Sequence, residues 1–388
     1  MASMTHRERV NAALNLEQPD RVPIDFGTIA STINNTAYQR FVKYMGFDSE
    51  LGREDLHDPV NPHKEVTPGP KVLELYGVDV RSVSAAQQVD AQSLNKVQLD
   101  DYTYRDEWGV LHERPRNEDG PYMIMHGPLR GDDLTIKDIE DYPWPDPAAG
   151  DRFADLREKA RKMHEETDYA IAVSVGHSSV SPCQRLRGFA QHMEDLALQP
   201  ELAECLIDHV TQVICGSAEA ILKECGDYVD IVSFADDLGL QDRAYFREPM
   251  FQKQIKPYMR RFVDTIHANT KAKAVMHTDG AVYKLIPDLI DIGVDAINPV
   301  QTTAANMEAE RLKKEFGKDL GFWGAVDTQN VLPFGTPEEV RADVRHKIDV
   351  LGKGGGYVIT SCHTIREEVP AENVHALYET ALEYGRYD

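Results

Sequence analysis

The sequence predicts an α/β protein, a (β/α)₈ TIM barrel in a single domain with an insertion in its N-terminal third. Eight short β-branched or aromatic runs recur along the chain, and a stretch with helical spacing of apolar residues follows each of them. Such alternation forces a mostly parallel sheet with helices outside it, and eight repeats close into a barrel of typically about 250 residues plus insertions. A chain of 388 residues is long enough for this fold. An open doubly wound sheet is the alternative.

The eight strands are expected at regular places in chain order. They are Val22–Phe26, Val78–Val83, Ala170–Val175, Val229–Phe234, Lys273–His277, Val294–Asn298, Leu320–Gly324 and Gly356–Thr360.

The helices between these strands are recognised by their apolar spacing and by their ends. Residues 340–351 carry apolar side chains at positions i, i+4, i+8 and i+11 of one face. Thr336 and Glu339 have the spacing of a capping box before that helix, and Pro370 and Gly385 bracket the last one. Strand and helix therefore alternate to the end of the chain.

Residues 91–151 interrupt this alternation. The stretch is rich in Asp, Pro, Gly and Tyr, and the prolines of Asp141–Pro147 exclude a helix there. We expect an irregular insertion into one domain that spans residues 1–388.

The charge balance excludes some classes of partner. Lys and Arg number 42 against 65 Asp and Glu, a formal net charge of −23, which disfavours nucleic acid. We see no run of about 18 apolar residues, so no membrane association is expected. Charged residues within Met1–Val10 exclude a signal-peptide core, and the five cysteines are too few and odd in number for a disulfide framework. We expect a cytoplasmic protein.

Reacting groups of a (β/α)₈ barrel come from the carboxyl ends of its strands. The polar residues at those positions are Asp25, Thr28, Arg81, His177, Ser178, Asp236, Asp237, His277, Asp279, Asn298, Gln301, Asp327, Gln329, Cys362 and His363. The set is rich in metal-binding and acid-base side chains.

A metal site is one interpretation of His277, Asp279 and Cys362. Residues i and i+2 of extended backbone point to the same side, so His277 and Asp279 converge. With Cys362 from the last strand they offer the N, O and S ligands that Zn²⁺ takes. The alternative is that His277 bonds backbone, Asp279 caps a helix and Cys362 is a small buried filler.

The remaining strand-end residues suit acid-base work or substrate binding. Asp236 and Asp237 are adjacent carboxylates, and a buried one would have a raised pKa and could act as a general acid or base, or they form a surface turn. His363 completes the catalytic set. The residues expected to bind substrate are Arg81, His177, Asn298 and Gln301.

Seven motifs together resemble the uroporphyrinogen-decarboxylase-like superfamily, which includes the tetrapyrrole decarboxylase of haem synthesis and zinc methyltransferases that act with corrinoid proteins. The motifs are Thr5–Val10, Pro19–Pro23, Asp236–Gly239, His277–Gly280, Ile292–Gln301, Gly354–Tyr357 and Val369–Asn373. The resemblance covers nearly the whole chain and implies the same (β/α)₈ barrel.

Two departures decide between the branches. The decarboxylase has an arginine-rich motif after its first strand, because its substrate carries eight carboxylates, whereas this chain has Gly27–Asn35 without arginine. The methyltransferases hold zinc with a His-x-Cys pair and a later Cys, which match His277 and Cys362 but leave Asp279 in place of the first Cys. Aspartate is a harder ligand and suits an ether or alcohol-type methyl donor better than a thiol.

The resemblance thus implies a zinc-dependent, corrinoid-linked methyltransferase or demethylase that acts on a small methylated ether-type substrate, with the corrinoid carried by a partner protein. One alternative is decarboxylation of a tetrapyrrole or smaller acid by His363 and Asp237. Another is a non-catalytic barrel that binds the corrinoid protein.

Overall fold

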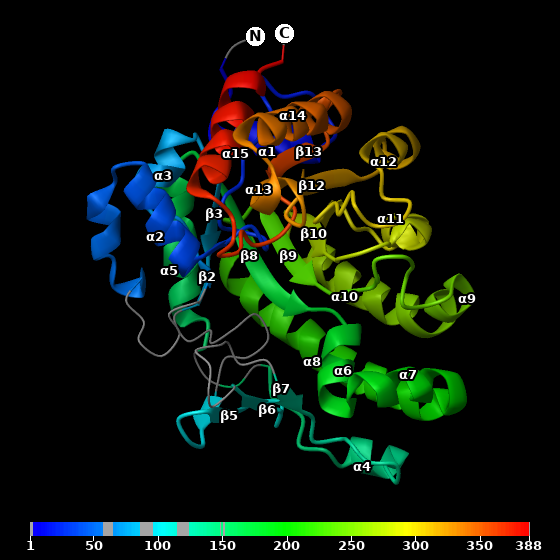
Figure 1. Cartoon of the computed structure of the whole chain (residues 1–388). Coiled ribbons are helices and arrows are strands. Elements are labelled where there is room, and N and C mark those ends of the chain that lie inside the picture. Colours follow the sequence, from blue (N-terminus) through cyan, green and yellow to red (C-terminus); the bar gives the residue numbers. More distant parts are fainter. Residues whose placement is uncertain are drawn as a thin grey trace.

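The chain folds around a curled sheet of seven parallel strands (Figure 1). The computed structural model describes residues 3–56, 65–85, 96–114, 124–147, 149 and 152–387. Neighbouring strands follow the order β13-β12-β11-β10-β9-β8-β3. Their bounds are β3 Val80–Val83, β8 Ala170–His177, β9 Ile231–Ala235, β10 Lys273–His277, β11 Ala296–Asn298, β12 Gly321–Val326 and β13 Tyr357–Ser361. Seven of the eight predicted strands are confirmed.

The segment Val22–Phe26, the remaining predicted strand, lies between the two edges of this sheet. Asp25 N–H donates to the carbonyl of Ile359 in β13, and Asp79 N–H donates to the carbonyl of Ile24. Pro23 has no N–H and only its carbonyl can pair, so the ladder stays too short to count as a strand. The segment nevertheless joins β13 to β3, and the (β/α)₈ fold class is confirmed.

The helices that the structure describes lie around the sheet, except that α1 lies at its amino end and α4 packs against α8, apart from the sheet (Figure 1). They are α1 His6–Leu14, α2 Asn35–Tyr44, α3 Pro70–Leu75, α4 Ile136–Glu140, α5 Ala154–Glu166, α6 Val180–Arg187, α7 Phe189–Leu198, α8 Pro200–Cys225, α9 Glu248–Met250, α10 Lys256–Asn269, α11 Ile286–Asp291, α12 Ala309–Phe316, α13 Val331–Phe334, α14 Pro337–Lys347 and α15 Ala371–Tyr384. Helix α14 begins with the predicted capping box of Thr336 and Glu339, and α15 runs between Pro370 and Gly385 as expected.

Helix α8 is long and apolar enough to cross a membrane, although the sequence analysis expects no membrane association. It is 26 residues long and its most apolar window has a mean hydropathy of 1.2, enough in length and composition to cross a bilayer. Half of that window is buried inside the protein, and the helix packs against α10, α5 and α7. These contacts are those of a core helix in a barrel.

The insertion is more regular than the sequence suggests. Within its described residues, four short antiparallel strands form a separate sheet in the order β4-β5-β6-β7, with bounds Lys96–Gln98, Thr103–Asp106, Leu111–Glu113 and Ile124–His126. Part of the predicted insertion (91–95, 115–123, 148, 150 and 151) lies outside the described residues. The strands of this sheet are polar and have only three or four residues, so they lack the alternation of apolar residues by which a strand is predicted from sequence. The prolines of Asp141–Pro147 exclude a helix there, as expected.

Helix α1 closes the amino end of the barrel. Its Val10 and Leu14 pack into the lower barrel interior with Trp323, Val275 and Val358. The remaining members of this cluster are Ile29, Val80, Ala170, Ala172, Ile231 and Ala296. The amino half of the barrel is therefore a packed apolar core.

A buried ion network ties α1 to the strands at the same end. Asp79 accepts from Arg9 at 2.8 Å and from Arg21 at 2.8 Å, and His6 Nδ1 lies 2.7 Å from its carboxylate. Asp20 holds the other side of Arg9, with its Oδ1 2.6 Å from Arg9 Nε. Two motifs that carry the resemblance, Thr5–Val10 and Pro19–Pro23, thus serve the structure of the amino end.

Candidate metal centre at the barrel mouth

The carboxyl ends of β10, β11 and β13 bring polar side chains into the mouth of the barrel. His277 ends β10 and lies level with Asn298, which ends β11, in the parallel register. Cys362 and His363 follow β13 directly. Above the apolar layer, the small side chain of Ala325 in β12 lines a pocket at this end.

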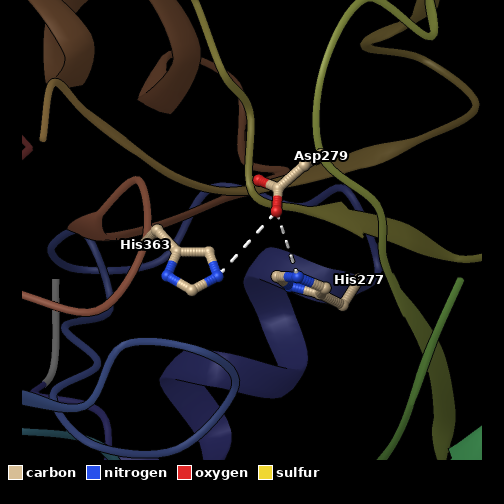
Figure 2. Close-up of side chains that lie close together, drawn as sticks. All are labelled: His277, Asp279 and His363. Atoms are coloured by element: carbon tan, nitrogen blue, oxygen red, sulfur yellow. Dashed lines mark ion pairs between the residues drawn. The ribbon is translucent and has the colours of Figure 1, made fainter. Parts of the chain in front are cut away.

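His277, Asp279 and His363 form a compact cluster there (Figure 2). Asp279 Oδ2 lies 3.6 Å from His277 Nε2 and 3.8 Å from His363 Nε2. Figure 2 shows both imidazole rings directed at this one carboxylate. The three ligand atoms lie within 4.8 Å of one another, whereas the ligands of a tetrahedral zinc lie about 3.4 Å apart, so contractions of about 0.2 to 1.4 Å fit them to the ion.

The hydrogen bond to Asn298 fixes the tautomer of His277. His277 Nδ1 lies 2.8 Å from Asn298 Oδ1, and because that oxygen can only accept, Nδ1 carries the proton. Nε2 is then the nitrogen that can bind a metal, in the arrangement typical of metal-bound histidines. Burial lowers the pKa of His277, but the hydrogen bond and charge of Asp279 outweigh it and raise the pKa above its ordinary value.

His363 has a different proton arrangement. The backbone N–H of Thr364 donates to His363 Nδ1 over 2.7 Å, so Nδ1 is unprotonated and a neutral ring carries its proton on Nε2. Burial lowers the pKa of His363, more than the Asp279 charge raises it. As it stands the Nε2–H of His363 faces Asp279 Oδ2 across 3.8 Å, too far for a hydrogen bond, and Nε2 becomes a ligand only when Thr364 N–H turns away and the ring proton moves to Nδ1.

Cys362 lies beside the cluster without belonging to it. Its sulfur is 3.9 Å from the Val300 carbonyl, and the residue is buried in the wall of the neighbouring pocket. Burial and the nearby Asp279 carboxylate raise the pKa of the thiol, which stays protonated at neutral pH. In the structure His363, expected as an acid-base residue, takes the third place that the sequence analysis gave to Cys362.

Two motif glycines let the loops of the mouth pack backbone against backbone. Gly280 has φ +85°, and a Cβ on it would lie 2.6 Å from backbone atoms of Gly239 and Leu240. Asp237 Oδ1 accepts from Asp279 N–H at 3.2 Å, so the exposed Asp237 stands at the rim of the cluster. The close packing explains why Asp236–Gly239 and His277–Gly280 occur together.

Asp236 points away from the mouth. Its carboxylate accepts from the hydroxyl of Ser178 and from the backbone N–H groups of Val180 and Ser181 at 2.8 and 2.6 Å, at the start of α6. Burial raises the pKa of Asp236 to about 6, against these hydrogen bonds, which lower it. The position is that of a helix-capping carboxylate.

The residues expected to bind substrate divide into two groups. Arg81 pairs with Ile171 near the amino end of β8, and its guanidinium lies 3.8 Å from the ring centroid of Tyr169, so it lies at the end of the barrel opposite the cluster. His177 ends β8 in the mouth, where its buried Nδ1 has no partner among the described residues, and burial lowers its pKa well below the ordinary value. Asn298 orients His277 as described above.

Gln301, the last of them, lines a pocket of about 350 Å³ beside the cluster. Asp279, Cys362 and His363 share this pocket with polar side chains from the loops after β9, β11 and β12. Gln329, one of these lining residues, is among the strand-end residues that the sequence analysis selected. Gln241 and Thr303, two others, are not among them. Gln241 stands too far beyond β9 for the strand-end rule to include it.

Comparisons with known proteins agree with this architecture. The family model of uroporphyrinogen decarboxylase (URO-D) matches residues 126–384, two thirds of the chain. The chain belongs to the URO-D family. No curated protein matches it.

Among solved structures, this URO-D family chain is similar to a methyltransferase from Methanosarcina mazei, with a TM-score of 0.64, 17% identity, and coverage of 98% of this chain and 99% of the other. A xylanase 10B from Thermotoga maritima matches with a TM-score of 0.37 and 12% identity over 64% of this chain and 86% of the other. At this identity the first match establishes the barrel fold over the whole URO-D family chain.

Proposed function

We propose that this URO-D family protein is a zinc-dependent methyltransferase or demethylase that passes the methyl group of a small ether-type substrate to a corrinoid carried by a partner protein. The cluster of His277, Asp279 and His363 carries the proposal, because it offers three ligand atoms within 4.8 Å at the mouth of the barrel. The similar Methanosarcina mazei protein is a methyltransferase, which supports the reaction class.

His277 and Asp279 would hold the metal, with His363 as the third ligand after its bond to Thr364 is released. Zinc bound there supplies Lewis-acid activation of the ether oxygen. The mouth excludes bulk water on one side through the packed core of the barrel, so substrate enters from the loop side.

The proposed reaction also needs a source of one proton at the mouth of the barrel. Transfer of the methyl group to the corrinoid of the partner would leave the bonding pair on the substrate oxygen, which would then need one proton. We assign the delivery of this proton from solvent to the exposed Asp237 at the rim, since Asp236 is committed to α6 and burial keeps His177 neutral.

The pocket gives little support to tetrapyrrole decarboxylation. Each carboxylate of a porphyrinogen that is buried without a cation costs several kcal/mol. Among the described pocket-lining residues, Arg366 is the single arginine, and it lies 3.5 Å from Glu65. Arg81 is at the far end of the barrel.

Metal analysis of the purified protein tests the proposal. We expect one zinc per chain, its loss in His277→Ala, and its retention in His267→Ala, an exposed histidine of α10. The activity assay mixes the reduced corrinoid protein with candidate methyl ethers and follows loss of the cob(I) absorption band. Zinc-free wild type, or formation of four-carboxyl product from uroporphyrinogen, contradicts the proposal.

A further inference from the structure

Three glutamine side chains, here called the glutamine triad (Gln241, Gln301 and Gln329), stand together in the pocket beside the metal cluster. Gln301 Nε2 donates to Gln241 Oε1 at 2.6 Å and approaches Gln329 Oε1 at 3.5 Å. Gln301 is buried, and the other two are exposed at the loops after β9 and β12. The buried amide therefore connects the two exposed ones.

The backbone N–H of Gly280, in the loop after β10, sets the orientation of all three amides. Gly280 N–H donates to Gln301 over 3.0 Å, and since a backbone N–H can only donate, the atom facing it is Oε1. The NH₂ group of Gln301 then faces its neighbours, whose facing atoms must be oxygens. Thr303 Oγ1 donates to the same Oε1 of Gln329 at 2.8 Å.

The two exposed amides consequently present donors. Both Oε1 atoms are occupied, and neither Gln241 Nε2 nor Gln329 Nε2 has an acceptor among the residues that the structure describes. Donors without partners in a pocket wall are matched by the oxygen atoms of a ligand.

The rest of the wall limits the size and charge of that ligand. A volume of about 350 Å³ is at the lower end for ligand pockets, and the described lining residues include no Phe, Tyr or Trp. Asp327 is occupied with the N–H groups of Gln329 and Asn330, and Arg366 is paired with Glu65. The free donors of the glutamine triad are thus uncharged amides, which suit hydroxyl or carbonyl oxygens better than a carboxylate.

We propose that the glutamine triad is a specificity subsite for the uncharged oxygens of a small, hydroxyl-bearing methyl ether whose methylated oxygen lies toward the His277 cluster. This rests on the proposed function for the methyl group, but the recognition of hydroxyl oxygens follows from the triad alone. Plain alkyl methyl ethers displace the water that hydrates these two exposed amides and offer their N–H groups no acceptor in return, so they bind more weakly.

Ligand-observed NMR on the full chain tests this with small probes. The probes are glycerol monomethyl ether, glycerol, butyl methyl ether and methoxyacetate. We expect the two hydroxyl-bearing probes to bind about tenfold more tightly than butyl methyl ether and methoxyacetate, the size of one or two neutral hydrogen bonds. Equal binding of butyl methyl ether, or preference for methoxyacetate, overturns the proposal.

Gln301→Glu is the most informative variant, because it keeps the size of the side chain and reverses the direction of the hydrogen bonds within the glutamine triad. One carboxylate oxygen still accepts from Gly280, but the other faces Gln241 and Gln329, which must turn their NH₂ groups inward and their oxygens toward the pocket. We expect the tenfold preference to vanish in Gln301→Glu and in Gln329→Leu, and to persist in Gln212→Leu, an exposed glutamine of α8. Thermal unfolding and zinc content verify that the variants are folded and loaded.

The outcomes separate this inference from the proposed function. Hydroxyl-dependent binding of glycerol without any methyl transfer supports the triad and contradicts the function. Methyl transfer from butyl methyl ether as fast as from glycerol monomethyl ether supports the function and overturns the triad. Persistence of the preference in both triad variants also overturns it.

Discussion

His277 Nδ1 donates to Asn298 Oδ1 over 2.8 Å, and this bond between the ends of two neighbouring strands fixes which nitrogen of His277 is free for a metal. We expect Asn298→Ala to weaken zinc binding by about 10–100-fold, the usual effect of removing the partner of a metal-bound histidine. Competition with a chromophoric chelator measures it. Asn269→Ala, at an exposed position at the end of α10, is the control and should retain wild-type affinity; an unchanged affinity in Asn298→Ala would contradict the role of this bond.

The third metal ligand distinguishes two residues that are neighbours in the sequence. Because His363 belongs to the cluster and Cys362 does not, His363→Ala should lose zinc while Cys362→Ser keeps it. Metal content of the two purified variants, loaded with one equivalent of zinc, gives the answer. The reverse pattern would restore Cys362 as the ligand and leave His363 as a proton carrier.

Acid should weaken the amino end of the barrel through Asp79. Burial raises the pKa of this carboxyl, but the His6 hydrogen bond and the charges of Arg21 and Arg9 outweigh it and hold the pKa below its ordinary value of 3.8. A depressed carboxyl pKa gives stability that is complete above the unfolded value and is lost as the pH falls through the folded one. The loss is therefore expected below about pH 4.

Asp79→Asn isolates that contribution. It leaves two buried arginines short of a charge partner, which costs about 3–5 kcal/mol at pH 7. We expect the free energy of unfolding, measured with denaturant, to be much lower in Asp79→Asn than in wild type at pH 7. The difference should be smaller at pH 3. Asp141→Asn, which removes an exposed pair with Lys137, should cost about 1 kcal/mol or less at either pH. A difference for Asp79→Asn that does not depend on pH would count against the assignment.

His192 of α7 should show the other kind of pH dependence. It is fully buried, neither ring nitrogen has a partner among the described residues, and burial lowers its pKa to about 4. A depressed imidazole pKa means that stability falls as the pH drops from about 6.5 to 4, by about 3 kcal/mol in total.

His192→Leu should remove that dependence and leave the protein at least as stable at neutral pH, since two unsatisfied nitrogens are replaced by apolar atoms. Thermal melting between pH 4 and pH 7 tests this, with His346→Leu at an exposed position as the control. If the melting temperature of His192→Leu depends on pH as strongly as that of wild type, other groups cause the dependence.

The sequence by itself determined the class of fold. Short β-branched or aromatic runs and amphipathic helices are local patterns, and chirality and burial leave few ways to stack eight such strand-helix units. The cap of α14 at Thr336 and the end of α15 at Gly385 were predictable for the same reason, since a capping residue acts on its own helix. The convergence of His277 and Asp279 also follows from backbone geometry between near neighbours.

Only the tertiary structure decided which strand-end residues meet. Asp236 and Asp237 are adjacent, yet one caps α6 and the other stands at the rim of the cluster, because the chain turns between them. Arg81 counted as a strand end, but β3 begins at Val80, and the parallel register puts that arginine at the amino end of the barrel. The choice of His363 over Cys362 depends on side-chain directions after β13, and the glutamine triad joins three loops whose approach is set by the curvature of the whole sheet. Local patterns fix the elements, whereas distances between loops depend on the packing of every element beneath them.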